Sequence, residues 1–171
     1  MQRLLNEICE TQLKVDSLTL STPAKASEHS APATDTEIIT LRANLAEQNL
    51  GLPPSFEQFL RITNGIKRYR YPERFNLRSI SKLVGRKQSD KGWDFPAPLC
   101  DFVIGRGNAT AQCSFDPGSI DSMGEMAVVE FNVEGTRTDH VNFEAFLRYD
   151  LAHHQFSLET EESDRANLAD D

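Results

Sequence analysis

The sequence predicts an α+β fold, and three observations lead to this prediction. Two segments between residues 34 and 65 combine helix-start signals with apolar residues at helical spacing. From Cys100 to Val141, short apolar runs alternate with turn residues, as is typical of antiparallel strands. Helical spacing returns after Asn142. Helices before and after a block of strands favour an N-terminal helix pair, an antiparallel mixed sheet and a Phe-rich C-terminal helix.

The first 34 residues are expected to lie outside this domain. Leu4, Leu5 and Ile8 fall on one face of a short helix over residues 2–20. The stretch Ser21–Ala33 is rich in Ser, Ala and Pro and has no apolar period, which is typical of a linker. Residues 1–34 are therefore assigned as an N-terminal appendage and linker; packing of the first helix on the domain is the alternative.

The domain is expected to begin with two helices. Thr34 and Glu37 have the spacing of a capping box, and the helix that follows should end near Asn49–Gly51, with Gly51 in the left-handed conformation. Its apolar stripe consists of Ile38, Leu41 and Leu45. Pro53 and Pro54 then suit the first turn of a second helix. Its shared face is formed by Phe56, Phe59, Leu60 and Thr63, and its stop signal is Asn64-Gly65.

The middle of the chain is basic. The chain as a whole has a net charge of −8, but residues 61–100 contain ten Lys or Arg against three Asp or Glu, and residues 101–171 contain four against fifteen. Such a dipolar chain can steer charged partners, unless the two halves neutralise each other on folding. Pro72 makes a helix unfavourable before Glu73, and residues 87–98 have the composition of a loop.

The strands follow from a change to period two. A strand near residues 102–105 is expected to turn at residues 105–108, and a second runs over Ala111–Phe115 and ends at Asp116-Pro117-Gly118. The clearest strand is Met126–Val133, followed by a short one within Thr136–Val141. In the clearest strand, the residues expected to face the core are Ala127, Val129, Phe131 and Val133, and those expected to face outward are Met126, Val128, Glu130 and Asn132.

The last helix is capped by Asn142. Its apolar stripe consists of Phe143, Phe146, Leu147 and Leu151. After Phe156 the chain is acidic and poor in apolar residues, so residues 157–171 are expected to be a disordered tail. The predicted domain therefore spans residues 35–156.

Three segments together resemble the SUKH superfamily of bacterial immunity proteins and fungal cell-wall assembly regulators. They are residues 47–60 with Thr63-Asn64-Gly65, residues 104–116, and Val141–Leu147. The chain departs from the family pattern in having two fewer residues between Leu50-Gly51 and Leu52-Pro53, and in Asn142, where the family has Ser. The resemblance implies a SUKH-like fold over residues 35–156. It also implies an immunity protein that directly binds and neutralises a cognate polymorphic, contact-dependent or secreted toxin such as a nuclease, or alternatively a non-catalytic scaffold or regulatory module.

The sequence contains no recognisable catalytic constellation, so we expect no enzyme, no cofactor and no metal. His29 lies in the predicted linker, and the adjacent His153 and His154 are expected to be surface residues at a helix end. No P-loop, nucleophile-elbow or zinc-protease motif occurs. Cys100 and Cys113 are expected to be small buried residues.

The sequence also predicts a cytoplasmic protein. It has no run of about 20 apolar residues, no secretory-signal pattern at its N-terminus, and an odd number of widely separated cysteines. The oligomeric state cannot be read from the pattern.

Two surfaces are candidates for binding the toxin. The first is acidic and would complement the basic site of a nucleic-acid-processing toxin; it consists of Asp116, Asp121, Glu125, Glu130, Glu134 and Asp139. The alternative face is basic and consists of Arg70, Arg74, Arg78, Lys82 and Arg86. The basic segment 67–87 could also contact nucleic acid, which the acidic charge of the whole chain disfavours.

Overall fold

The computed structural model describes residues 1–19, 28–67, 76–77, 80–83, 103–106, 111–132 and 136–169. Within these residues the fold is α+β, as predicted, with a long Phe-rich C-terminal helix. The helices are α1 (Gln2–Thr19), α2 (Asp35–Ala46), α3 (Pro54–Ile62), α4 (Ile80–Leu83), the 3-10 helix Pro117–Ser119, and α5 (Phe143–Ala169). The strands are β1 (Glu28–His29), β2 (Ile66–Lys67), β3 (Asn76–Leu77), β4 (Val103–Arg106), β5 (Ala111–Asp116), β6 (Ala127–Asn132) and β7 (Arg137–His140).

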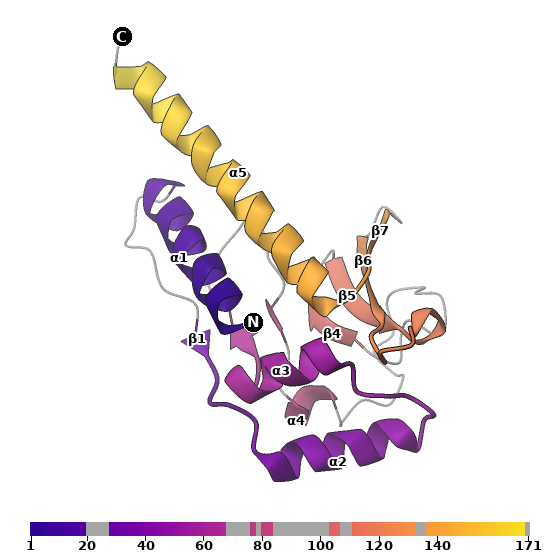
Figure 1. Ribbon diagram of the computed structural model, residues 1–171. Helices are drawn as coiled ribbons and strands as arrows, with labels where there is room; N and C mark the ends of the chain where they lie inside the picture. Colours follow the sequence, from indigo (N-terminus) through magenta and orange to yellow (C-terminus); the bar gives the residue numbers. More distant parts are fainter. Residues whose placement is uncertain are drawn as a thin grey trace.

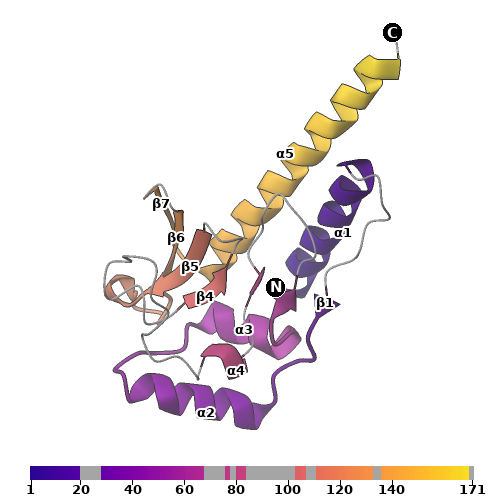
Figure 2. The same ribbon diagram turned by 180° about the vertical axis from the view of Figure 1, so that it is seen from behind.

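The seven strands form one sheet in which each strand pairs with its neighbours in sequence. The order is β1-β2-β3-β4-β5-β6-β7, and every pairing is antiparallel. α5 runs diagonally past the sheet with α1 beside it, and α3 lies between α2 and the sheet (Figures 1 and 2). Among the described residues, no helix is long and apolar enough to cross a bilayer.

The capping box at the start of α2 is confirmed. The Thr34 hydroxyl accepts a hydrogen bond from the Glu37 backbone N–H at 3.2 Å, and the Glu37 carboxylate accepts one from the Thr34 N–H at 2.8 Å. These bonds satisfy backbone donors that the first helical turn leaves free. The end of the helix differs from expectation, because Asn49 (φ 58°) rather than Gly51 adopts the left-handed conformation.

The signals that define α3 are confirmed. Pro53 precedes the helix and Pro54 occupies its first turn. Proline has no backbone N–H, and an N–H in the first turn has no acceptor within the helix, so no helical hydrogen bond is lost. Gly65, just beyond the helix, has a φ of 107°, a conformation that favours glycine.

The core forms where α3, β5 and α5 meet. The Phe56 ring lies 5.2 Å from that of Phe115 and 5.0 Å from that of Phe143, and Phe59 lies 5.2 Å from Phe143, all close to edge-to-face. This geometry places the positive edge of one ring against the negative face of another. All four side chains are fully buried.

The expectation that residues 1–34 form an appendage is wrong for the parts that the structure describes. Leu4, Leu5 and Ile8 belong to the same core cluster as Phe56, and α1 packs along α5. β1 also joins the sheet, with His29 opposite Ile66. The apolar face of α1 is therefore covered by the domain, while residues 20–27 of the predicted linker lie outside the described residues.

The expectation of a disordered acidic tail is also wrong up to residue 169. α5 continues to Ala169, and the Arg165 guanidinium donates to the carbonyl oxygen of Leu18 at the far end of α1. The tail contains good helix formers such as Glu, Ala, Leu and Arg. This segment also packs against α1, which was not expected to belong to the domain.

The predicted orientation of β6 is reversed. Met126 and Val128 belong to the core cluster, and Val128 pairs with the core residue Phe115. Because side chains alternate along a strand, Ala127, Val129 and Phe131 face the opposite side. Val129 is nevertheless fully buried there, and Val133 lies outside the described residues. β4 also runs through Gly105, which pairs with Cys113, so Gly105 and Arg106 are strand residues and not part of the expected turn, whose remaining residues 107–108 lie outside the described residues.

Candidate functional site: the loop between β5 and β6

The predicted acidic face does not form one surface. Asp116, Asp121 and Glu125 lie in or beside the connection between β5 and β6. Glu130 pairs with Thr138 and Asp139 pairs with Val129, so these two acids lie on opposite faces of the sheet. Glu134 lies outside the described residues. The candidate site is therefore the β5–β6 loop, which we define as residues 117–126.

Asp121 holds the tip of this loop. Its Oδ1 accepts hydrogen bonds from the backbone N–H of Met123 at 2.8 Å and of Glu125 at 2.9 Å. The Asp121 N–H donates to the Glu125 carbonyl oxygen at 2.9 Å, and Gly124 supplies a positive φ of 81°. An aspartate that accepts from nearby backbone N–H groups is typical of a tight turn. The carboxylate therefore shapes the loop from within.

Asp116 and Ser119 close the base of the loop. Asp116 Oδ1 accepts from the Gly118 N–H at 2.9 Å, so it caps the 3-10 turn. The Ser119 hydroxyl donates to the Asp116 carbonyl oxygen and accepts from the Ala127 N–H, both at 2.7 Å. These bonds tie the end of β5 to the start of β6.

Glu125 anchors the loop to α3. Its carboxylate accepts from the backbone N–H and from the hydroxyl of Ser55, each at 2.7 Å. Ser55 lies in the first turn of α3. A carboxylate is favourable there because free N–H groups and the positive end of the helix dipole face it. Glu125 thus caps a helix that lies 70 residues earlier in the chain.

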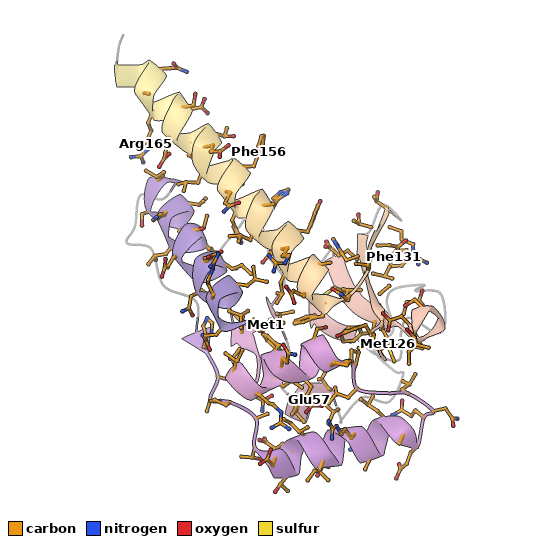
Figure 3. The ribbon with its side chains drawn as sticks, in the orientation of Figure 1. Met1, Glu57, Met126, Phe131, Phe156 and Arg165 are labelled. Carbon is orange, nitrogen blue, oxygen red and sulfur yellow. The ribbon has the colours of Figure 1, made fainter. Side chains whose placement is uncertain are left out.

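The loop exposes two large apolar side chains. Ile120 is 54% exposed and Met123 is 76% exposed, while Met126, which follows and is labelled in Figure 3, is buried in the core. The neighbouring Ser119, Asp121 and Glu125 side chains are held in hydrogen bonds within the protein. Neither residue was predicted, because the stronger signal in this segment of the sequence is its charge.

The acids near the loop are partly neutralised by Arg137. Its Nε donates to Asp139 at 2.7 Å, and its terminal nitrogen lies 3.5 Å from an Asp116 oxygen. The guanidinium also lies 6.0 Å from the centre of the Phe131 ring. This sheet face therefore presents mixed charge.

Glu130 has a structural environment. Its carboxylate lies 2.6 Å from His140 Nε2, and the His140 ring packs against Phe146 and Tyr149 of α5. His140 is buried and Glu130 is half-buried. The pair therefore contributes to the packing of β6 and β7 against α5.

The alternative basic face cannot be placed. Arg70, Arg74, Arg78 and Arg86 lie outside the described residues, and Lys82 belongs to α4 with its side chain outside the description.

A polar group between α1 and α5 was not predicted. Its members are almost fully buried: Gln12, Asp16, Asp150 and His154. His154 Nε2 lies 3.9 Å from Asp150 Oδ1, so the expectation of a surface histidine is wrong at this position. The four-residue spacing of each pair on its helix was the available signal. Within the described part of the chain, no three His, Cys, Asp or Glu side chains are placed to hold a metal ion.

The β5–β6 loop has the chemistry of a contact surface, with apolar side chains at its centre and polar groups fixed around them. Cys113 is buried, as predicted, and Cys100 lies outside the described residues. No protein-family model matches the chain, and no curated protein matches it.

Proposed function

We propose that the protein is an immunity protein, which neutralises a cognate toxin by binding it at the β5–β6 loop. The proposal rests on the resemblance to the SUKH superfamily and on one structural observation. That observation is a loop fixed by internal hydrogen bonds that presents Ile120 and Met123 to solvent.

Such a loop suits protein binding for two physical reasons. Burial of an apolar side chain in an interface contributes about 25 cal/mol per Å² removed from water. A loop that is already ordered also loses less conformational entropy on binding than a mobile one. Ile120 and Met123 are therefore suited to be energetic anchors, surrounded by polar groups that set orientation.

The residues that carry the family resemblance support a scaffold role rather than a chemical one. Pro53 and Pro54 begin α3, Gly65 follows its end, and the Asn142 side chain accepts from the Ala145 N–H at 2.9 Å to cap α5. These residues build the domain, so specificity for a partner must come from its surface.

The structure also changes the expected role of the acidic residues. Asp116, Asp121 and Glu125 use their carboxylates to hold the loop. We propose that they act on the toxin indirectly, by fixing Ile120 and Met123, and that charge attraction is a secondary contribution.

The test is growth rescue followed by co-purification. The chain is co-expressed with the product of its neighbouring gene, and the double variant Ile120→Asp/Met123→Asp is compared with Ile39→Asp. Ile39 is a matched control because it is 64% exposed and lies on α2. We expect rescue and co-purification by the natural chain and by the control, and loss of both in the double variant.

Failure of the natural chain to rescue growth, or to bind, contradicts the immunity function. Full binding by a folded double variant contradicts the assignment to the loop. Circular dichroism establishes that each variant is folded.

A further inference from the structure

A second exposed apolar stripe lies on α5. Tyr149 is 47% exposed and Phe156 is 69% exposed, and His153 between them is also exposed. Tyr149 and Phe156 are seven residues apart, close to two helical turns, so they share one face of the helix. The Tyr149 and His153 rings lie 6.1 Å apart.

This stripe faces away from α1. The residues of α5 that are buried on the other side include Leu147, Leu151 and His154. Figure 3 shows Arg165 directed toward α1 and Phe156 directed away from it. α5 therefore has two contact faces, and α1 covers one of them.

Charges flank the stripe in a pattern that can complement itself. Arg148 and Glu159 are eleven residues apart, about three helical turns, so they lie on the same flank of α5. Arg148 is exposed and bonds only along its own helix, to Glu144, among the contacts described for it. The flank thus carries Arg148, paired with Glu144, near the start of α5 and Glu159 farther along it.

We propose that this face binds α5 of a second copy of the chain, in antiparallel orientation. In a two-fold antiparallel pair, identical flanks meet. A two-fold axis near His153 then brings Tyr149 of one copy to Phe156 of the other, and the same axis brings Arg148 of one copy to Glu159 of the other. The ring contact and the charge contact therefore require the same register.

The parallel arrangement is less favourable. It would place the acidic ends of the two helices side by side, and these ends contain Glu159, Glu161, Glu162 and Asp164. Like charges at close range disfavour association. One helix from each copy also forms a contact smaller than the ~1,200 Å² of a stable interface, so we expect a reversible dimer whose population rises with concentration.

The test uses charge reversal in the full chain. Arg148→Glu makes the flank acidic at both positions, and Glu159→Arg makes it basic at both. Each variant alone should be monomeric, because both of its intermolecular contacts become repulsive. An equimolar mixture should restore dimer, because both contacts become attractive in the heterodimer.

The measurement is sedimentation equilibrium over a range of concentrations. Phe156→Glu should weaken the natural dimer at least tenfold, and the control Ile39→Glu should leave it unchanged; both positions are exposed, so folding should be retained. The proposal is overturned if the natural chain is monomeric up to ~1 mM, because a Kd above this value means an association free energy weaker than about 4 kcal/mol. It is also overturned by a mixture of the two charge variants that stays monomeric, or by a dimer that Phe156→Glu does not weaken.

Discussion

At the residue scale, the acidic side chains of the β5–β6 loop act mainly as caps. Asp116 caps the 3-10 turn, Asp121 caps the loop tip, and Glu125 caps α3. A carboxylate is a strong acceptor for backbone N–H groups, and a short acidic segment next to Gly and Ser can fold around it. Residues that look like a charged surface in the sequence therefore serve to order the backbone.

Glu125→Ala should lower the free energy of unfolding by about 1.5–3 kcal/mol, because it removes the charged acceptor from both donors of Ser55. Urea unfolding at neutral pH measures this change. Glu7→Ala is the control, since Glu7 forms an exposed pair with Arg3 within α1 and should contribute less than about 1 kcal/mol. Equal effects for the two variants would contradict the capping role of Glu125.

The α2 capping box should make stability depend on pH. Hydrogen bonds from the Thr34 backbone and side chain lower the pKa of Glu37 below its ordinary value of 4.5. A group whose pKa is lower in the folded state stabilises the fold above its unfolded pKa, and this contribution disappears as the pH falls through the folded pKa. Natural protein and Glu37→Ala should therefore differ in stability at pH 7 and converge as the pH falls below 4.5 and through the lowered folded pKa, as measured by urea unfolding across that range. A difference that does not depend on pH would contradict this linkage.

At the element scale, α1 is part of the core and not an accessory. Its apolar residues pack in the same cluster as the phenylalanines of α3 and α5, and its far end receives the Arg165 side chain. α1 and α5 support each other along their length, which explains why an acidic C-terminal segment remains helical.

Two substitutions on α1 should distinguish the contribution of its buried face to stability from that of its more exposed face. Ile8→Ala removes a fully buried side chain and should destabilise the protein by about 2–5 kcal/mol. Leu13→Ala, at a position that is 37% exposed on the same helix, should change stability by less than about 1 kcal/mol. Thermal unfolding followed by circular dichroism compares them. A similar small effect for both would support the original expectation of an appendage.

The sequence was sufficient for elements whose signals are local. The Thr34–Glu37 box, the Pro53-Pro54 start of α3 and the Asn142 cap are each fixed by residues within one turn. It was insufficient where the decisive contact is distant. The face of β6 was assigned wrongly because Met126 and Val128 on one side are as apolar as Ala127 and Val129 on the other. The pattern therefore indicates a strand but does not show which of its two faces is buried in the core.

The same reason limits the prediction of the site. The acidic residues were found by composition, but their hydrogen bonds to Ser55 and to the loop backbone depend on how the chain returns to α3. The exposure of Ile120 and Met123 depends on that return as well. When a single apolar residue lies in a segment of turns, the sequence does not show whether its side chain contacts a partner or is buried in the core.

At the scale of the whole molecule, the two proposed contacts lie on different parts of the fold. The β5–β6 loop is beside the sheet, and the C-terminal end of α5 projects away from it (Figures 1 and 2). Toxin binding and self-association should therefore be separable. Phe156→Glu should reduce dimerisation and leave growth rescue intact, while Ile120→Asp/Met123→Asp should do the reverse. Sedimentation and co-purification on the same preparations test this, and loss of both activities in either folded variant would contradict it.

The packing of α1 on α5 has a consequence for synthesis on the ribosome. α1 is translated well before its packing partner α5, which begins at Phe143. At roughly 5–20 residues per second, the apolar face of α1 waits on the order of ten seconds for Leu147 and Leu151. During that interval the nascent chain presents Leu4, Leu5 and Ile8 to any chaperone near the exit tunnel, and the native arrangement can close only after α5 has left the tunnel.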